Sequence, residues 1–503
     1  MSAARNAATT CLTAPAPAAA TAATAATAAT AAIATATGPA AVAPAASRAA
    51  APAEVGSPLP VLGDDVRVPL AGGGTAPYAA LDYAASAPAL RAVWDDVAAY
   101  APYYGSVHRG TGHLSQLSTE LFETARATVA EFLGARDGDQ VVFTRSTTDS
   151  LNLLAAALPA DTRVFVFETE HHAALLPWRR AGGGVQHLAT PASPERAVAV
   201  LDAALAAHRR QRPHAPALVC VTGASNVTGE LWPVRELVEA AHRHGARLVL
   251  DAAQLAPHRA VSLRELGADW VALSGHKLYA PFGAGVLAGR ADWLDAAEPY
   301  LAGGGATATV RRGTAEDHPD ADQVGDLAVR WHRGPARHEA GSPNVIGAYA
   351  LASACRALAA AGLEELTRRE EALLRRLRAG LAAVPEVRVL SLFGDDAPRV
   401  GVLSFTVRGW DSRRLAVALS ERYGIGVRDG LFCAHPLVGA LLGDQPGEPA
   451  PCAVPDSGGA ETALRAVRVS FGAGTPVEHV DRLVRAVAEL VREGDPAAAA
   501  PGC

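Results

Sequence analysis

The sequence has no cysteines at the spacing of a disulfide framework or a metal site. Six cysteines are scattered along 503 residues, without a CxxC pair or a cluster of histidine and cysteine. A disulfide-rich fold and a zinc site are therefore not expected. A reducing compartment, the cytoplasm, is the simpler interpretation of these isolated thiols.

Long apolar runs and a strong excess of one charge are also missing. No stretch is apolar for long enough to span a membrane. The formal net charge is −6, which gives no electrostatic reason to expect nucleic acid or an anionic membrane as a partner. The composition, with 50% hydrophobic and 19% charged residues, is that of a large globular protein.

The N-terminal segment, residues 1–60, is biased towards alanine, threonine and proline and contains the run AATAATAATAAT. With almost no large apolar side chains it cannot offset the entropy lost on folding. Only Arg5 precedes the run, which does not match a signal peptide. We expect a disordered tail; a start codon assigned upstream of the true one is the alternative.

From residue 61 onward, short apolar runs alternate with helical patterns. This alternation predicts an α/β domain with a mostly parallel sheet covered on both faces. A helix before Gly134 and another at 233–244 follow from the spacing of apolar residues. Five runs read as buried strands: Gln140–Thr144, Arg163–Phe167, Ala217–Thr222, Arg247–Asp251 and Asp269–Ser274.

The pattern changes near residue 345, where two long helical segments, 346–361 and 363–384, are followed by strands at 387–390 and 400–407. A helix from Ser412 and a closing helix at 477–492 complete a smaller α+β domain. We therefore divide the chain into a tail, a segment packing with the small domain, a large domain, the small domain and a second tail, at 1–60, 61–105, 106–345, 346–495 and 496–503.

Lys277 directly follows a predicted strand, in the sequence Ser274-Gly275-His276-Lys277. A lysine in this position is costly unless it is paired or used covalently, and Schiff-base chemistry needs a desolvated lysine. The strand RLVLD ends on Asp251, at an edge where doubly wound sheets bind ligands. A carboxylate there can keep a pyridinium nitrogen protonated. The alternatives are a surface turn for the lysine and a helix cap for Asp251.

Two further strand ends carry polar residues. Ser146-Thr147-Thr148 precedes a helix, where hydroxyls and free N–H groups form an anion site suited to a cofactor phosphate. Glu170-His171-His172 follows the strand RVFVF, and an imidazole there can stack on a planar ring. An ordinary N-cap and a loop histidine are the alternatives. No third ligand lies at metal spacing.

These segments occur in an order that resembles the class V aminotransferase family, most closely its SUF-type (group II) cysteine desulfurases. The resemblance covers residues 80–490 and implies the large and small domains of fold type I enzymes, which depend on pyridoxal 5′-phosphate (PLP) and form homodimers. It rests on TRSTTDSLN, ETEHHAALLPW, ASNVTGELWPV, LDAAQLAPH, SGHKLYAPFGAGVL and RHEAGSPN.

The resemblance also implies roles for individual residues. Lys277 carries the cofactor, Asp251 pairs with its pyridine nitrogen, Gln254 reaches its phenolic oxygen and His171 stacks over its ring. Asn226 and Arg468 bind the substrate carboxylate, with Arg428 near the substrate. The phosphate is held by Thr147, Thr148, Ser274 and His276, and by Ser342 of the neighbouring subunit.

The resemblance places Cys433, in VRDGLFCAHPL, as the catalytic cysteine. It implies a desulfurase that converts L-cysteine to L-alanine, holds the sulfur as a persulfide on Cys433, and passes it to an acceptor protein. A thiolate must do this work, although a free cysteine is often simply buried.

Three features depart from the family. Leu431 and Phe432 replace two histidines, the Tyr-Asn after Arg468-Val469-Ser470 is missing, and residues 441–462 are long and add Cys452. The apolar pair at 431–432 keeps an alternative open, namely an aminotransferase, epimerase or lyase acting on another amino acid. A non-catalytic scaffold would require a lost Lys277 or Asp251, and both residues are present.

Overall fold

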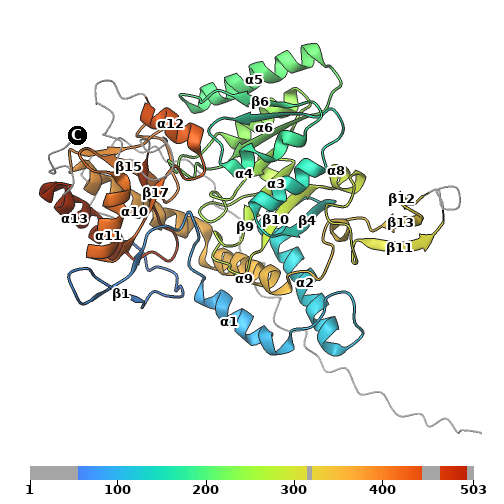
Figure 1. Ribbon diagram of the computed structural model, residues 1–503, viewed down its shortest axis with the longest axis horizontal. Helices are drawn as coiled ribbons and strands as arrows, with labels where there is room; N and C mark the ends of the chain where they lie inside the picture. Colours follow the sequence, from blue (N-terminus) through green and yellow to red (C-terminus); the bar gives the residue numbers. More distant parts are fainter. Residues whose placement is uncertain (1–54, 314–319, 444–464, 496–503) are drawn as a thin grey trace, which may run out of the picture. The chain divides into compact units, whose positions relative to one another are not determined.

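The central sheet has seven strands in the order β4-β10-β9-β8-β7-β5-β6 (Figure 1). The structure is a computed structural model that describes residues 55–313, 320–443 and 465–495. Strand β10 is antiparallel to both of its neighbours, while the other six strands run in one direction. The strands are β4 (Asp139–Thr144), β5 (Arg163–Phe167), β6 (Val185–Leu188), β7 (Ala217–Thr222), β8 (Arg247–Asp251), β9 (Trp270–Ser274) and β10 (Gly285–Arg290).

Both faces of this sheet are buried, which explains why its strands are continuous apolar runs. In β7, Val219 and Val221 belong to one apolar cluster, while Leu218 and Cys220 belong to another on the opposite face. The first cluster includes α1 (Arg91–Tyr100), α2 (His113–Phe132), α5 (Pro194–Gln211), α6 (Val234–Arg243), α7 (Leu263–Leu266) and α9 (Val345–Ala361). The second includes α3 (Thr147–Ala156), α4 (His172–Leu175), the 3-10 helix η2 (Pro177–Arg180) and α8 (Ala291–Ala296).

The five predicted strands are confirmed, and so is the mostly parallel sheet. The antiparallel strand β10 was not predicted, because its sequence GVLAGR contains two glycines and only one β-branched residue. These glycines are needed for close approach. A Cβ on Gly285 would lie 2.5 Å from Ser146 Cα, and one on Gly289 would lie 2.1 Å from the Asp269 carbonyl oxygen.

A second core lies after residue 362 and is built on an antiparallel sheet of order β14-β15-β18-β17. Helices α10 (Leu363–Ala382), α11 (Ser412–Tyr423) and α13 (Val477–Glu493) supply its apolar side chains, in agreement with the predicted helices. The strands are β14 (Val387–Val389), β15 (Val402–Val407), β17 (Arg428–Gly430) and β18 (Ala466–Ser470). Helix α12 (His435–Gly443) follows β17.

The segment before α1 contacts this second core. Strand β3 (Ala79–Ala80) pairs in parallel with β16 (Ile425–Gly426), and Leu81 lies in the same apolar cluster. Strands β1 (Arg67–Pro69) and β2 (Thr75–Pro77) form a short antiparallel pair. The domain boundaries stay a prediction, and residues 1–54 of the expected tail lie outside the described part of the chain.

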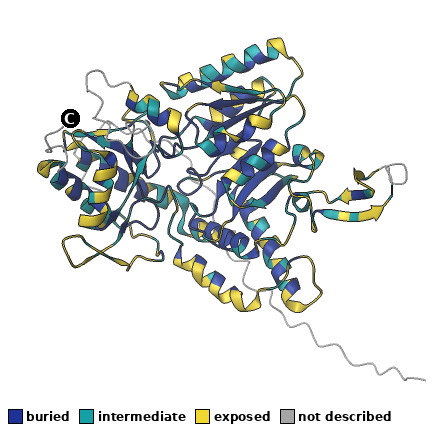
Figure 2. Cartoon of the chain, viewed as in Figure 1, coloured by how far each residue is buried: buried dark blue, intermediate teal, exposed yellow. Residues whose placement is uncertain are grey.

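A three-stranded sheet of β11 (Thr307–Arg312), β13 (Leu327–Trp331) and β12 (Asp322–Val324) extends beyond α8 and is largely exposed (Figures 1 and 2). The 3-10 helices η1 (Ala101–Tyr103) and η3 (Pro335–Arg337) lie in connections. Among the described helices, none is by itself long and apolar enough to cross a membrane, although α9 and α10, bent by 80°, satisfy that test together.

Candidate active site

The predicted site residues of the large sheet meet at one edge. Strands β9, β8, β7 and β5 are adjacent and parallel, so their carboxyl ends lie side by side. Ser274, Asp251 and Thr222 end the first three of these strands, and His171 follows the fourth. In open α/β sheets this edge is where ligands bind.

Lys277 lies in the turn after β9 and is half-buried. Burial lowers the pKa of its amine to about 8; the Asp251 carboxylate opposes this, and Arg468 and Arg428 add to it. Among the described residues, none forms a hydrogen bond or ion pair with this amine. Roughly a tenth of the amine is therefore uncharged at pH 7 and able to react with a carbonyl.

Asp251 is 4% exposed, and burial raises the pKa of its carboxyl group while Lys277 opposes the shift. Its Oδ1 accepts a hydrogen bond from the Ala253 N–H at 2.9 Å, so part of the expected capping role is present. Its Oδ2 accepts none from the described residues. Gln254 is equally buried, and its Nε2 donates to the Ala84 carbonyl at 2.8 Å.

The start of α3 forms an anion cradle with the end of β9. The Thr147 N–H donates to Ser274 Oγ at 2.8 Å, and the two hydroxyl groups lie 2.8 Å apart. Ser146 is the N-cap, and its Oγ accepts from the Asp149 N–H. Thr148 is exposed, and its N–H has no acceptor among the described residues. Free N–H groups and hydroxyls at a helix start favour a phosphate.

His171 is the N-cap of α4, where its Nδ1 accepts a hydrogen bond from the Ala173 N–H at 3.0 Å. This contact assigns the ring proton to Nε2. Burial lowers the pKa of His171 to about 3, and Lys277 and His172 contribute. The ring is therefore uncharged near neutral pH.

Cys433 lies between β17 and α12 in a loop that is tied to the large sheet. The His172 N–H donates to the Cys433 carbonyl at 2.8 Å, and Asn226 Nδ2 donates to the Phe432 carbonyl at 2.8 Å. Cys433 is half-buried. The other described cysteines, Cys220 and Cys355, are buried, and burial raises the pKa of both thiols. Cys433 is therefore the accessible thiol among the described residues.

Two arginines lie opposite each other on neighbouring strands of the second core, Arg428 on β17 and Arg468 on β18. Arg468 is 1% exposed; it pairs with Asp82 at 2.7 Å and donates to the Asn226 carbonyl at 3.1 Å. Its Nε has no partner among the described groups. Facing like charges are unfavourable, and a bound carboxylate would relieve them.

Two predicted phosphate-binding residues, Ser342 and His276, form no hydrogen bond with Thr147 or Ser274. Ser342 is exposed before α9 and makes no hydrogen bond to the described residues around Lys277. His276 is half-buried and lies 3.2 Å from Ser86 Oγ through Nδ1; burial lowers its pKa. Most of the 441–462 segment, including Cys452, lies outside the described residues.

Two residues at the site received no role from sequence reasoning. Asp82, the ion-pair partner of Arg468, has no local motif, and the two are 386 positions apart. Glu170 was noted only as part of a histidine segment. Its side chain is fully buried, Oε1 accepts from the Thr222 N–H at 3.0 Å, and burial raises its pKa well above the ordinary value.

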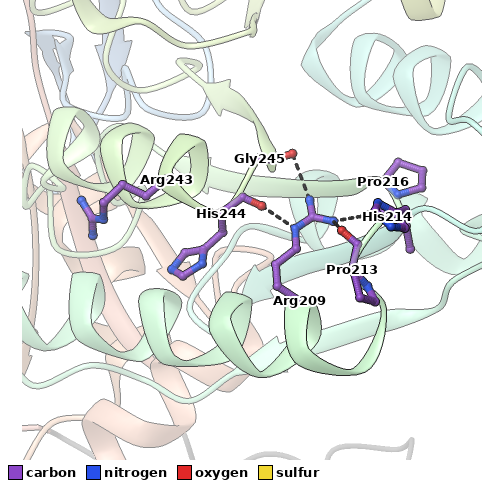
Figure 3. A pocket seen from close by; sticks show the side chains of 8 residues that line it. Arg209, Pro213, His214, Pro216, Arg243, His244 and Gly245 are labelled. Carbon is purple, nitrogen blue, oxygen red and sulfur yellow. Dashed lines mark hydrogen bonds between the residues drawn. The ribbon is translucent and has the colours of Figure 1, made fainter.

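A surface depression near the end of α5 is lined by residues whose contacts hold the fold together (Figure 3). Arg209 donates to the carbonyl groups of His244, Gly245 and Ala215, which ties the end of α5 to the turn after α6. Its guanidinium is thereby committed to main-chain acceptors, and the depression adds nothing to the site at Lys277.

The mostly parallel sheet, with Lys277, Asp251 and the anion cradle at its edge, is that of a fold type I enzyme, a class of PLP-dependent transferases. The chain belongs to the class V aminotransferase family, whose model matches residues 79–483. That family uses PLP, and the residues here fit it: a reactive amine, an unpaired carboxylate oxygen and a hydroxyl-lined helix start lie at one sheet edge.

The relatives are cysteine desulfurases. The chain is 35% identical over 374 residues to the cysteine desulfurase of Enterobacter sp. (strain 638), covering 72% of this chain and 86% of that protein. It is 32% identical to a probable cysteine desulfurase of Vibrio cholerae, covering 82% and 94%. Among solved structures, an apo cysteine desulfurase from Thermococcus onnurineus NA1 has a TM-score of 0.68 at 30% identity, covering 83% of this chain and 95% of that one.

Proposed function

We propose that this chain is a PLP-dependent cysteine desulfurase that converts L-cysteine to L-alanine and receives the sulfur on Cys433. The observation that carries this proposal is the docking of an accessible thiol beside the cofactor edge, through the 2.8 Å bond from the His172 N–H to the Cys433 carbonyl. Its relatives, named cysteine desulfurases, support the same reaction.

The cofactor would be held by groups from four strand ends. Lys277 would carry it covalently, Asp251 would pair with its pyridine nitrogen, Gln254 would reach its phenolic oxygen, and His171 would lie against its ring. Thr147, Thr148, Ser274 and His276 would hold its phosphate. When bound, PLP supplies an electron sink for charge that develops on the substrate carbon.

The chain's own residues would do the rest. Arg468, Arg428 and the Asn226 amide would bind the substrate carboxylate, and the neutral amine of Lys277 would move the proton at the substrate Cα. The Cys433 thiolate would attack the substrate sulfur, so a carbon–sulfur bond breaks as a sulfur–sulfur bond forms. The carbon keeps the electron pair and takes a proton, which balances cysteine and thiol against alanine and persulfide.

A homodimer is part of this proposal, because Ser342 would contact the phosphate in the neighbouring subunit. Ser342 is exposed and forms no hydrogen bond with Thr147 or Ser274, which supports such a role. The persulfide would pass to a sulfur-acceptor protein. We propose a cytoplasmic location, which the free thiols of Cys220, Cys355 and Cys433 support.

Mass spectrometry of the Cys433 peptide tests the proposal most directly. After incubation of the PLP-loaded protein with L-cysteine, the peptide should gain the mass of one sulfur atom, and L-alanine should appear in equal amount. L-Alanine without added sulfur on Cys433 would overturn the nucleophile assignment. Absence of both products would overturn the reaction and favour another amino acid as substrate.

A further inference from the structure

Phe432, the residue before the thiol, contacts both groups proposed to bind the substrate carboxylate. We propose that Phe432 is a positioning residue that holds the Cys433 thiol, Arg468 and Asn226 in one arrangement. This inference rests on the proposed function and assigns a role to one more residue. The family pattern does not suggest that role, because it has histidine at this position.

The Phe432 ring faces Arg468. The guanidinium carbon lies 5.2 Å from the ring centroid, and Arg468 is itself 1% exposed. A desolvated cation over an aromatic face is held by the charge distribution of the ring. Because the two residues are this close and both are buried, the ring limits where the guanidinium can lie.

The Phe432 main chain holds the other carboxylate-binding group. Asn226 Nδ2 donates to the Phe432 carbonyl at 2.8 Å, while the Asn226 carbonyl accepts from Arg468 Nη1 at 3.1 Å. Phe432, Asn226 and Arg468 therefore form a closed triangle of contacts. Displacing one member changes the position of the other two.

The same residue sets the backbone at the nucleophile. Phe432 has φ +52° and Cys433 has φ +54°, a left-handed conformation that is unfavourable for residues other than glycine. Such strain persists only where the surroundings over-determine it. Here the Ala434 N–H closes the turn on the Leu431 carbonyl at 2.9 Å, and the His172 N–H holds the Cys433 carbonyl.

Burial of the Phe432 ring supplies much of that restraint. The side chain is 3% exposed and belongs to an apolar cluster that joins the loop to α12 and to the second core. The ring is thus enclosed by these apolar side chains and by Arg468. The other buried members of the cluster are Val227, Leu390, Ala434, Leu437, Val438, Leu442 and Ala466.

Two variants separate the roles of the ring. Phe432→Leu keeps an apolar side chain in the cluster but removes the aromatic face, so KM for L-cysteine should rise roughly tenfold with kcat within about twofold. Phe432→Ala also removes the packing, so KM should rise and kcat should fall together. Leu431→Ala, at the neighbouring half-buried residue, is the matched control and should change neither value by more than about twofold.

A second measurement needs no turnover. The rate ratio of iodoacetate to iodoacetamide at Cys433, measured on its peptide, reports the positive charge that Arg468, Arg428 and Lys277 place around the thiol. The ratio should fall about threefold in Phe432→Ala, the size of one partly exposed ion pair, and stay unchanged in Leu431→Ala. Cofactor content and Tm identify any variant that fails to fold.

Each outcome is decisive. If Phe432→Leu leaves KM unchanged, or folded Phe432→Ala leaves the alkylation ratio unchanged, Phe432 is only a packing residue and the inference is wrong. If the wild-type protein forms no alanine from L-cysteine, the proposed function fails, while the alkylation ratio still decides whether Phe432 positions the thiol.

Discussion

The two halves of the site are built differently. The half around Lys277 lies at the edge of one sheet, where main-chain ladders place Thr222 opposite Asp251 and Ser274 two residues beyond the partner of Asp251 on the next strand. The half around Cys433 depends on side chains that meet across long separations, such as Arg468 with Asp82 and Asn226 with Phe432. The first arrangement follows from strand order, while the second exists only once both cores have formed.

The largest effect is expected in the half around Lys277. Lys277→Ala should lower turnover by roughly 10²–10⁴-fold, because it removes the group proposed to move the substrate proton. Covalent retention of PLP after borohydride reduction and denaturation should also be lost. Lys277→Arg, which keeps the charge but offers no neutral amine, should behave in the same way. Retained covalent cofactor in Lys277→Ala would show that a different group carries it.

The next largest effect is expected in the half of the site around Cys433. Cys433→Ser should abolish alanine formation from L-cysteine while leaving cofactor content unchanged, because Cys433 belongs to the loop and not to the sheet edge. Cys355→Ala, at a buried cysteine of α9, serves as the control and should retain turnover. Alanine formation by Cys433→Ser at the wild-type rate would show that the half of the site around Cys433 does not supply the nucleophile.

A smaller effect is expected where the halves meet at the substrate. Arg468→Lys should raise KM for L-cysteine roughly tenfold, because lysine cannot reproduce a bidentate contact with a carboxylate. Asp82→Asn removes the ion-pair partner at 2.7 Å and should shift KM in the same direction through misplacement of Arg468. Steady-state kinetics with unchanged cofactor content would check both, and an unchanged KM in Arg468→Lys would remove Arg468 from the substrate.

The smallest effect is a pH dependence within the half around Lys277. With a pKa of about 8, the uncharged fraction of the amine rises from roughly 10% at pH 7 to roughly 90% at pH 9. Covalent capture of PLP by the apo protein should therefore accelerate about tenfold over that range. A rate that is flat between pH 7 and 9 would mean that the amine is not the titrating group.

The same shift has a consequence for stability. The pKa of Lys277 is lowered from 10.5 to about 8 in the folded chain, so the unfolded chain binds more protons between these values. The contribution of Lys277 to the free energy of unfolding therefore rises with pH from about 8 to about 10.5. The difference in Tm between apo wild type and Lys277→Met should change in that direction.

Most of the fold was predictable because its signal is local. Five strands and the long helices α2, α9, α10 and α13 follow from apolar periodicity and agree with the structure to within a few residues at most of their ends. Strand β10 escaped because glycine serves close backbone approach there, as at Gly285 against Ser146. The three-stranded sheet of β11, β13 and β12 escaped because most residues of β11 and β12 are exposed, so these strands lack an alternating apolar pattern.

The sequence by itself determined which polar residues lie at the strand ends. Asp251 ends a recognisable apolar run, and Lys277, Thr147 and His171 each follow one. Because the carboxyl ends of parallel strands lie at the same edge of the sheet, these residues come together there. Tertiary structure alone decided the surroundings of the thiol. Asp82 pairs with Arg468, and Phe432 turns inward at a left-handed backbone, because buried charges and strained residues are stable only with partners from distant segments. No local pattern encodes such partners, so the departure at Phe432 acquires a role only in the folded chain.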